Sequence, residues 1–261
     1  MIRVQHLTKC FGKLTAVDDI SFTIQAGEIF AFLGPNGAGK TTTIKMLTTI
    51  LTPTSGTVEI NGLNLAGRQI EARAFFGVVF QDPSLDQDLT AWENMELHGV
   101  LYGMPRKLCH ERAETLLQVF GLWDRKDSQA RQFSGGMKRR LEVARGLMHT
   151  PRILFLDEPT LGLDPQSRKQ MWTQVRQLNQ SEGVTIFLTT HYLDEADRVA
   201  SRIAVIDHGK IVAMGTPQEI KTQTGTESLE EAFLALTGSN VRDESPNPRD
   251  DMRAVARKWG R

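Results

Sequence analysis

The chain has 261 residues, of which 40% are hydrophobic and 24% charged, enough for one or two domains with a buried core. Thirty-one basic residues balance thirty-one acidic residues, so no overall field steers the protein toward nucleic acid or an anionic membrane. Cys10 and Cys109 lack the spacing of a metal site and do not form a disulfide framework, which favours a reducing cytoplasm.

The N-terminal segment has no apolar stretch of signal-peptide length, so we expect a chain that is not secreted. Apolar runs such as 153–156 and 185–188 are far shorter than the ~20 residues needed to cross a bilayer. If the protein serves a membrane, we expect it to do so from outside the lipid.

The first third of the chain has β periodicity. Apolar and polar residues alternate over 20–25, and the dense apolar run 28–33 follows, which predicts antiparallel strands leading into a buried strand. The pairs Asn61-Gly62 and His208-Gly209 each separate two β-like segments. Since glycine permits the positive φ of a tight turn, both pairs predict hairpins.

From 92 to 148 the period becomes helical, which predicts a helical insert over about 90–150. One helical face is predicted to consist of Leu108, Ala113, Leu116, Leu117 and Phe120. The runs 153–156 and 185–188 then flank a polar helical stretch at 166–180, an alternation typical of parallel strands joined by crossover helices.

The chain becomes polar and proline-interrupted after Gly238, so we expect a flexible tail over 239–261. Within the tail, 252–261 has apolar residues at helical spacing with only positive charges between them. This segment is compatible with an anionic membrane surface or with a disordered terminal extension, the latter being favoured.

Residues 34–42, GPNGAGKTT, lie between an apolar run and a helix-capable stretch, the context of a phosphate-binding loop. The glycines let successive N–H groups face a phosphate. Lys40 supplies a full charge, and Thr41 offers a hydroxyl to Mg²⁺. The residues predicted to bind a nucleoside triphosphate are Gly34, Pro35, Asn36, Gly37, Ala38, Gly39, Lys40, Thr41 and Thr42. The alternative is a glycine-rich turn without a ligand.

Asp157 and Glu158 end the apolar run at 153, where a parallel sheet presents side chains to a ligand. We expect Asp157 to hold Mg²⁺ through water and Glu158 to orient or deprotonate an attacking water. Strand-ending acids that merely cap the next element are the alternative.

A third segment, residues 134–136, reads SGG and opens a helical stretch. Ser134 with Gly135 and Gly136 forms a candidate second anion site at the start of a helix. The alternative is that Ser134 is an ordinary N-cap and nothing more. The basic run 138–140 that follows is interpreted as a solvated face.

These segments, with Gln81, the sequence GLDP at 162–165 and His191, occur in an order that resembles the nucleotide-binding subunit of ABC transporters over residues 2–238. The resemblance implies an α/β P-loop NTPase fold, the ABC cassette, with a RecA-like mixed sheet, an antiparallel β subdomain and an inserted helical subdomain. It also implies that the chain is an ATPase using ATP and Mg²⁺.

The resemblance assigns further roles. Gln81 would join Thr41 and Asp157 at the metal and sense the γ-phosphate, and His191 would hold that phosphate. Asp164 would act across a subunit interface. Phe11 matches the aromatic that stacks on adenine, although a core aromatic is the competing interpretation.

The sequence departs from the common family pattern at two places. Phe133 and Met137 flank the shared SGG, and Phe11 stands where tyrosine is usual. The SGGM variant, the run DEPTLGLDP and the segment SLEEAFLALTG resemble the bacterial drug-resistance branch, the daunorubicin-type exporter ATPases.

In the family that the chain resembles, two cassettes pack head to tail around ATP. Since this chain has one phosphate loop and one SGG segment, the resemblance implies two copies or a close partner, and we expect a homodimer when ATP is bound. The resemblance also implies a separate integral membrane permease, contacted around 81–105 on the inner face of the cell membrane, and no nucleic acid. The alternatives are a non-transport ABC ATPase acting on nucleic acid or translation and a small-molecule kinase. Long coiled coils or a second cassette, expected of the former, are absent from the sequence.

Overall fold

The computed structural model describes residues 2–238. The predicted flexible tail, 239–261, and the basic amphipathic segment within it lie outside the described residues.

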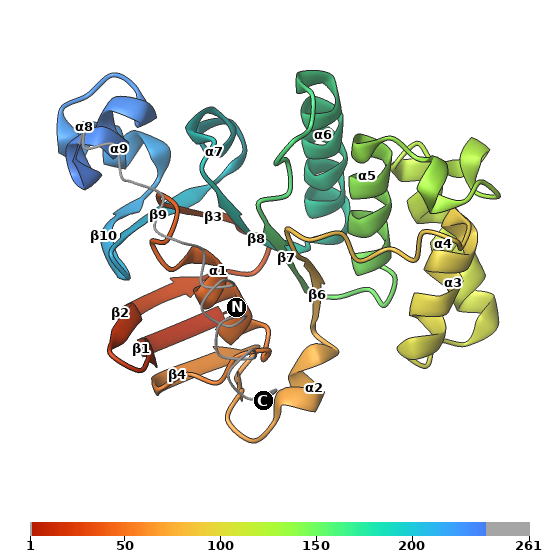
Figure 1. The fold of residues 1–261 in the computed structure, drawn as a ribbon, viewed down its shortest axis with the longest axis horizontal. Helices are drawn as coiled ribbons and strands as arrows, with labels where there is room; N and C mark the ends of the chain where they lie inside the picture. The colour runs from red at the N-terminus through yellow and green to blue at the C-terminus, as the bar shows by residue number, and fades with distance from the viewer. Residues whose placement is uncertain (1, 239–261) are drawn as a thin grey trace, which may run out of the picture.

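A six-stranded mixed sheet forms the centre of the described chain, with the strand order β10-β9-β3-β8-β7-β6 (Figure 1). All neighbouring pairs are parallel except β9 and β10. Its strands are β3 Ile29–Leu33, β6 Phe76–Val79, β7 Ile153–Asp157, β8 Thr185–Thr190, β9 Arg202–Asp207 and β10 Lys210–Gly215. The predicted alternation of parallel strands and crossover helices is therefore confirmed.

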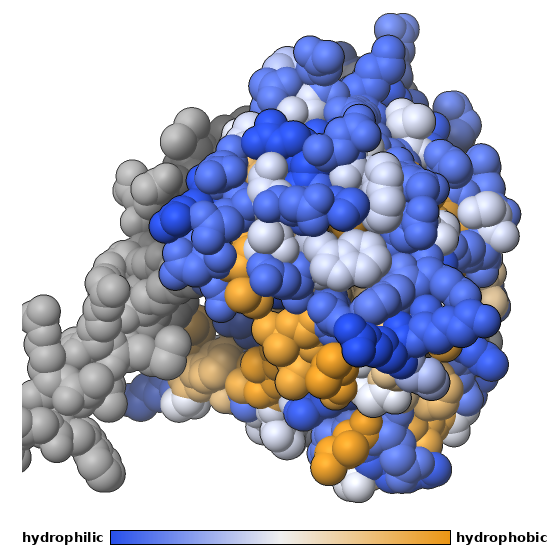
Figure 2. Space-filling model, turned by 90° about the vertical axis from the view of Figure 1, so that its right-hand side faces the viewer, coloured by the Kyte–Doolittle hydropathy of each residue, from blue (hydrophilic) through white to orange (hydrophobic). Residues whose placement is uncertain are grey.

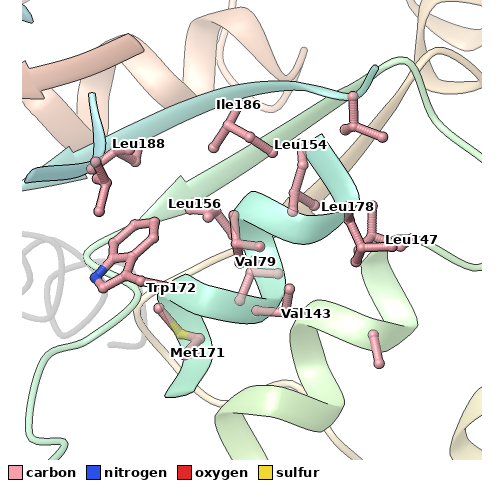
Figure 3. Close-up of a cluster of buried hydrophobic side chains, with 14 of the residues drawn as sticks. Val79, Val143, Leu147, Leu154, Leu156, Met171, Trp172, Leu178, Ile186 and Leu188 are labelled. Carbon is pink, nitrogen blue, oxygen red and sulfur yellow. The ribbon is translucent and has the colours of Figure 1, made fainter. Parts of the chain in front are cut away.

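Both faces of this sheet are covered, as continuous apolar strands require. In β7, Leu154 and Leu156 point to one face, which packs against α5 and α6, as Figure 3 shows. Ile153 and Phe155 point to the other face, which packs against α1 and the antiparallel strands. The carboxyl ends of β3, β7 and β8 thus meet at one edge of a rigid core.

A second, antiparallel sheet has the order β2-β1-β4-β5. Its strands are β1 Ile2–Phe11, β2 Leu14–Ile24, β4 Ser55–Ile60 and β5 Leu63–Asn64. Ile20, Phe22 and Ile24 are buried while the polar residues between them are partly or fully exposed, as the alternation predicted.

Both predicted hairpins are confirmed. Asn61 and Gly62 join β4 to β5, and His208 and Gly209 join β9 to β10. In each pair both residues have positive φ, 51° and 79° in the first and 45° and 77° in the second, as a type I′ turn requires.

Helices lie on both sides of the central sheet. Their bounds are α1 Lys40–Leu47, α2 Gln69–Arg73, α3 Ala91–Leu101, α4 Arg106–Val119, α5 Gly135–Gly146, α6 Pro165–Glu182, α7 Leu193–Val199, α8 Pro217–Thr224 and α9 Leu229–Thr237. Helices α3 to α5 fall within the predicted insert of 90–150; that this segment forms a separate subdomain stays a prediction. The stretch predicted helical at 166–180 is α6.

The predicted apolar face of α4 is wrong at one position. Leu108 is 50% exposed, whereas its neighbour Cys109 is 2% exposed and packs in the core with Ala113 and Leu116. A shift of one residue turns a side chain by about 100° around the helix axis. The pattern 109, 113, 116, 117 and 120 is the buried face.

Candidate nucleotide-binding site

The predicted phosphate loop joins the buried strand β3 to helix α1. Gly37 and Gly39 have φ of 77° and 107°, and a Cβ on Gly39 would lie 2.5 Å from the carbonyl oxygen of Ala16. A Cβ on Gly34 would lie 2.4 Å from the carbonyl oxygen of Ile206. The loop can follow this path only with glycine at these positions, and its backbone curls around the start of α1 as phosphate binding requires.

Lys40 lies within this loop rather than in solvent. Its Nζ donates to the carbonyl oxygens of Gly34 and Pro35 at 2.8 and 3.1 Å and lies 3.6 Å from Oε1 of Glu158. Burial lowers the pKa of Lys40, and the carboxylates of Glu158 and Asp157 oppose that shift. The Lys40 side chain therefore lies at the mouth of the loop, beside Glu158, the residue predicted to orient or deprotonate the attacking water.

Asp157 is the buried end of β7, with 1% exposure. Its Oδ1 accepts hydrogen bonds from Thr189 Oγ1 at 2.6 Å and from Thr41 Oγ1 at 3.4 Å. Burial raises the pKa of Asp157, and these two hydrogen bonds partly offset the shift. A cation bound beside Asp157 would stabilise the ionised form of this carboxylate.

The oxygen ligands around Asp157 fit Mg²⁺. This ion prefers one or two carboxylates together with hydroxyl, water and phosphate oxygens. Asp157 and Thr41 supply a carboxylate and a hydroxyl in hydrogen-bond contact. Within residues 2–238 no group of three or more His, Cys, Asp or Glu side chains is arranged to hold a metal alone.

Glu158 begins the turn after β7 and has a φ of 46°, in the left-handed region that is strained for residues other than glycine. Its N–H donates to the carbonyl oxygen and to Oγ1 of Thr189, both at 3.1 Å. Its Oε2 lies 2.9 Å from Nδ1 of His191. The structure thus brings together Lys40, Glu158 and His191 at one edge of the sheet.

Ser134 is an N-cap, as predicted: its Oγ accepts a hydrogen bond from the Met137 N–H at 3.2 Å. Ser134 and Gly135 are exposed, and a Cβ on Gly135 would meet nothing within 4 Å. Helix α5 packs on the face of the sheet opposite to α1. Among the described residues, no hydrogen bond or ion pair joins Ser134 to Lys40, and an anion site at Ser134 stays a prediction.

The remaining predicted residues lie at the surface. Gln81 follows β6 and is exposed. Phe11 is 48% exposed with Lys9 Nζ 5.2 Å from its ring centroid, which excludes the core-aromatic interpretation. Asp164 is exposed and caps α6, accepting from the N–H groups of Gln166 and Ser167 at 3.0 Å.

The interpretation of the basic run 138–140 as a solvated face is wrong for Arg139. This residue is 8% exposed, and its guanidinium donates to main-chain carbonyls around Asp157 and Glu158. Sequence reasoning also missed Thr189, which contacts both acids. The signal for Thr189 was its place at the end of the apolar run from 185, the same sheet edge that identified Asp157.

A family model described as ABC transporter matches residues 17–161. The chain is 42% identical to the daunorubicin/doxorubicin resistance ATP-binding protein DrrA of Streptomyces peucetius, over 98% of this chain and 84% of that protein. It is 43% identical to the Nod factor export ATP-binding protein I of Ralstonia nicotianae, over 85% and 69% of the two chains. The linearmycin resistance ATP-binding protein LnrL of Bacillus subtilis is 38% identical, over 93% and 76%.

Solved structures share the fold. An ATP-binding subunit of an ABC transporter is similar with a TM-score of 0.82 and 31% identity, over 90% of this chain and 99% of that chain. A dimeric ATP-binding cassette in a post-hydrolysis state, bound to ADP and Pi, is similar with a TM-score of 0.74 and 27% identity, over 83% and 98%. The predicted cassette fold is confirmed, and the chain belongs to the ABC transporter family as a nucleotide-binding subunit and ATPase.

Proposed function

We propose that this chain hydrolyses ATP to drive export of a solute through a separate membrane protein. Similarity to the ATP-binding proteins named for drug resistance and for Nod factor export supports export rather than import. None of the helices within residues 2–238 has the length and apolar character needed to span a bilayer. The path for the solute would therefore be supplied by a permease partner, with this chain on the inner face of the membrane.

The observation that carries the proposal is the contact of Glu158 with both Lys40 and His191 beside the phosphate loop. On nucleotide binding, the phosphates would replace Glu158 and the loop carbonyls as partners of Lys40. Glu158 would then be free to orient and deprotonate the attacking water, while His191 holds the γ-phosphate. The exposed ring of Phe11 would stack on the base.

Thr41, Asp157 and Gln81 would hold Mg²⁺. Bound there, the ion would neutralise charge on the β- and γ-phosphates. Asp157 supplies the buried carboxylate, Thr41 the hydroxyl already within its reach, and Gln81 an exposed amide after the next strand.

A second copy of the chain would complete the site. Ser134 and Gly135 present a capped helix start with exposed backbone on the side of the sheet away from α1, while Gly136 is buried. Packed head to tail, two copies would bring this segment of one against the phosphate loop of the other, with the exposed Asp164 between them. The similar cassette whose solved structure is dimeric supports pairing of two copies.

The permease would dock on helix α3. An apolar patch there consists of Leu97, Val100, Leu101 and Tyr102, which are 47%, 65%, 74% and 41% exposed. Figure 2, which faces the α3 and α4 end of the molecule, shows hydrophobic side chains gathered in its lower half. Patches of this kind mark protein interaction sites. The patch lies within 81–105, the segment expected to contact the partner.

The alternative of an ATPase acting on nucleic acid or translation is not favoured. The named relatives concern resistance and export, and basic and acidic residues are equal in number. We therefore propose no nucleic-acid partner.

Glu158→Gln tests the catalytic assignment. Removing the carboxylate leaves the phosphate loop intact, so we expect unchanged nucleotide affinity, turnover lower by a factor on the order of 10² to 10⁴, and dimers that persist in ATP. Phosphate release and size-exclusion chromatography measure the two effects. Turnover near the wild-type rate would exclude Glu158 as the general base.

Leu101→Glu tests the docking surface. The side chain is already 74% exposed, so the variant should fold and keep its basal ATPase rate. A buried charge at the permease contact would weaken binding, and we expect less of the variant to copurify with membranes from its own cells. The matched control is Ile70→Glu on α2, at an apolar residue that is 84% exposed. Equal membrane association of the two variants would contradict the assignment.

Asp157→Asn tests whether the buried carboxylate of Asp157, a proposed ligand of Mg²⁺, destabilises the ligand-free fold. Because the folded-state pKa of Asp157 is raised, its ionised form destabilises the ligand-free fold above that pKa. We expect Asp157→Asn to unfold at higher urea concentration than wild type at pH 8, while losing Mg²⁺-dependent nucleotide binding. The stability gain should shrink as the pH falls toward the unfolded-state pKa.

The control for this experiment is Asp194→Asn, which removes an exposed carboxylate paired with Arg198 and should change stability little. A loss of stability in ligand-free Asp157→Asn that is largest at pH 8 and disappears as the pH falls would show that the charge of Asp157 stabilises the fold instead.

A further inference from the structure

Arg139 is a buried arginine in the first half of helix α5, which ends at Gly146. It is 8% exposed, although the basic residues on either side of it in the sequence are partly exposed. Its guanidinium makes five hydrogen bonds: Nε to Pro159 O at 2.8 Å, Nη1 to Phe80 O at 2.6 Å and Glu142 Oε2 at 3.0 Å, and Nη2 to Asp157 O at 3.0 Å and Glu158 O at 3.3 Å. All three guanidinium nitrogens are thus engaged.

Three of these acceptors are consecutive carbonyls, those of residues 157, 158 and 159. They belong to Glu158 and to the residues before and after it, and Glu158 has a strained φ of 46°. On the other side, Thr189 accepts the Glu158 N–H with both its carbonyl oxygen and Oγ1. Arg139 and Thr189 therefore hold the main chain of Glu158 from opposite sides, which fixes the direction of its carboxylate.

The fourth carbonyl, that of Phe80, belongs to the peptide that leads into Gln81. Farther along the same segment, the Ser84 N–H donates to Oε1 of Glu142 at 2.7 Å, and Arg145 Nη1 donates to Ser84 O at 2.7 Å. Helix α5 thus holds the segment 80–84 at both ends. Arg139 is the side chain that contacts this segment and the main chain of Glu158 at once.

The chemistry of the contact requires arginine. A guanidinium is a planar fork of five donors, whereas an ammonium is a compact point with three. Glu142, whose side chain is 4% exposed, neutralises the buried charge at 3.0 Å. The pair is therefore tolerated in the core, and the remaining donors are left to bind carbonyls.

We propose that Arg139 is a positioning residue for hydrolysis. It couples the backbone around Glu158 to the segment that carries Gln81, so that displacement of this segment or of α5 moves the carboxylate relative to the phosphate loop. The inference rests on the proposed catalytic role of Glu158. It assigns Arg139 no contact with nucleotide.

The first test compares kcat and KM for Arg139→Lys and Arg139→Met, with Arg176→Met as the control. Arg176 is exposed on α6 and makes no hydrogen bond or ion pair within the described residues. A small misplacement of a reacting group costs on the order of 100-fold in rate. We expect a fall of about that size in kcat for both Arg139 variants and KM within about twofold of wild type. A rise in KM with kcat unchanged would contradict the proposal.

Removing Arg139 alone leaves Glu142 buried without its partner, which is destabilising. The double variant Arg139→Met/Glu142→Met removes both charges and keeps the side-chain volume. We expect it to fold, to bind ATP as wild type does, and to keep the low kcat. A folded double variant with wild-type kcat would contradict the positioning role.

A double-mutant cycle with Glu158→Gln separates positioning from general loosening of the fold. If Arg139 acts through the Glu158 carboxylate, Arg139→Lys should lower kcat in the wild-type background and leave it unchanged in the Glu158→Gln background. Full additivity of the two effects would contradict the proposal. If Glu158→Gln alone hydrolyses ATP at the wild-type rate, the proposed function of Glu158 fails, an outcome distinct from a failure of Arg139.

Discussion

The site depends on how strand β7 ends. Because side chains alternate along a strand, Asp157 points to the face that packs against α1, where Thr41 lies within hydrogen-bond reach. The next residue, Glu158, leaves the strand with a positive φ, and its carboxylate lies beside Lys40 and His191 instead. Two adjacent acids thus occupy different surroundings, and burial raises the pKa of Asp157. Asp157 is suited to bind a cation, and Glu158 is suited to orient a water molecule.

This arrangement is costly, and the neighbouring residues compensate for it. Thr189 contacts both acids, satisfying the Asp157 carboxylate and the Glu158 N–H. Lys40 offsets the negative charge of Glu158. Arg139 binds the carbonyls that follow the strand. A strained backbone persists only where its surroundings determine it from several directions, and such strain is found at functional sites.

The sequence was sufficient for features that depend on local chemistry. The phosphate loop follows from glycines at 34, 37 and 39, since their conformations and close contacts admit no side chain. The hairpins at 61–62 and 208–209 follow from positive φ, and the cap at Ser134 from its hydroxyl. The end of β7 was predicted because an apolar run that stops at two acids fits a parallel strand at a sheet edge.

The features that escaped prediction depend on tertiary contacts. Arg139 lies between two other basic residues, and only the packing of α5 against β7 decides that its side chain turns inward while its neighbours stay partly exposed. Leu108 and Cys109 are both apolar, so periodicity alone left the rotation of α4 uncertain by one position. Thr189 became informative only when β8 was placed beside β7. The hydropathy pattern identifies helices and strands, but the direction in which a single side chain points depends on the residues it packs against.

The central claim is that each chain carries half of two composite sites, the phosphate loop of one copy working with Ser134 of the other. Mixing Lys40→Ala chains with Ser134→Arg chains tests it most directly, since a mixed dimer contains one site with both defects and one intact site. We expect each variant alone to be nearly inactive and an equal mixture to recover about a quarter of wild-type turnover. Random pairing makes about half of the dimers mixed, and each mixed dimer has one intact site of two. A mixture as inactive as its components, or full activity in Ser134→Arg alone, would contradict it.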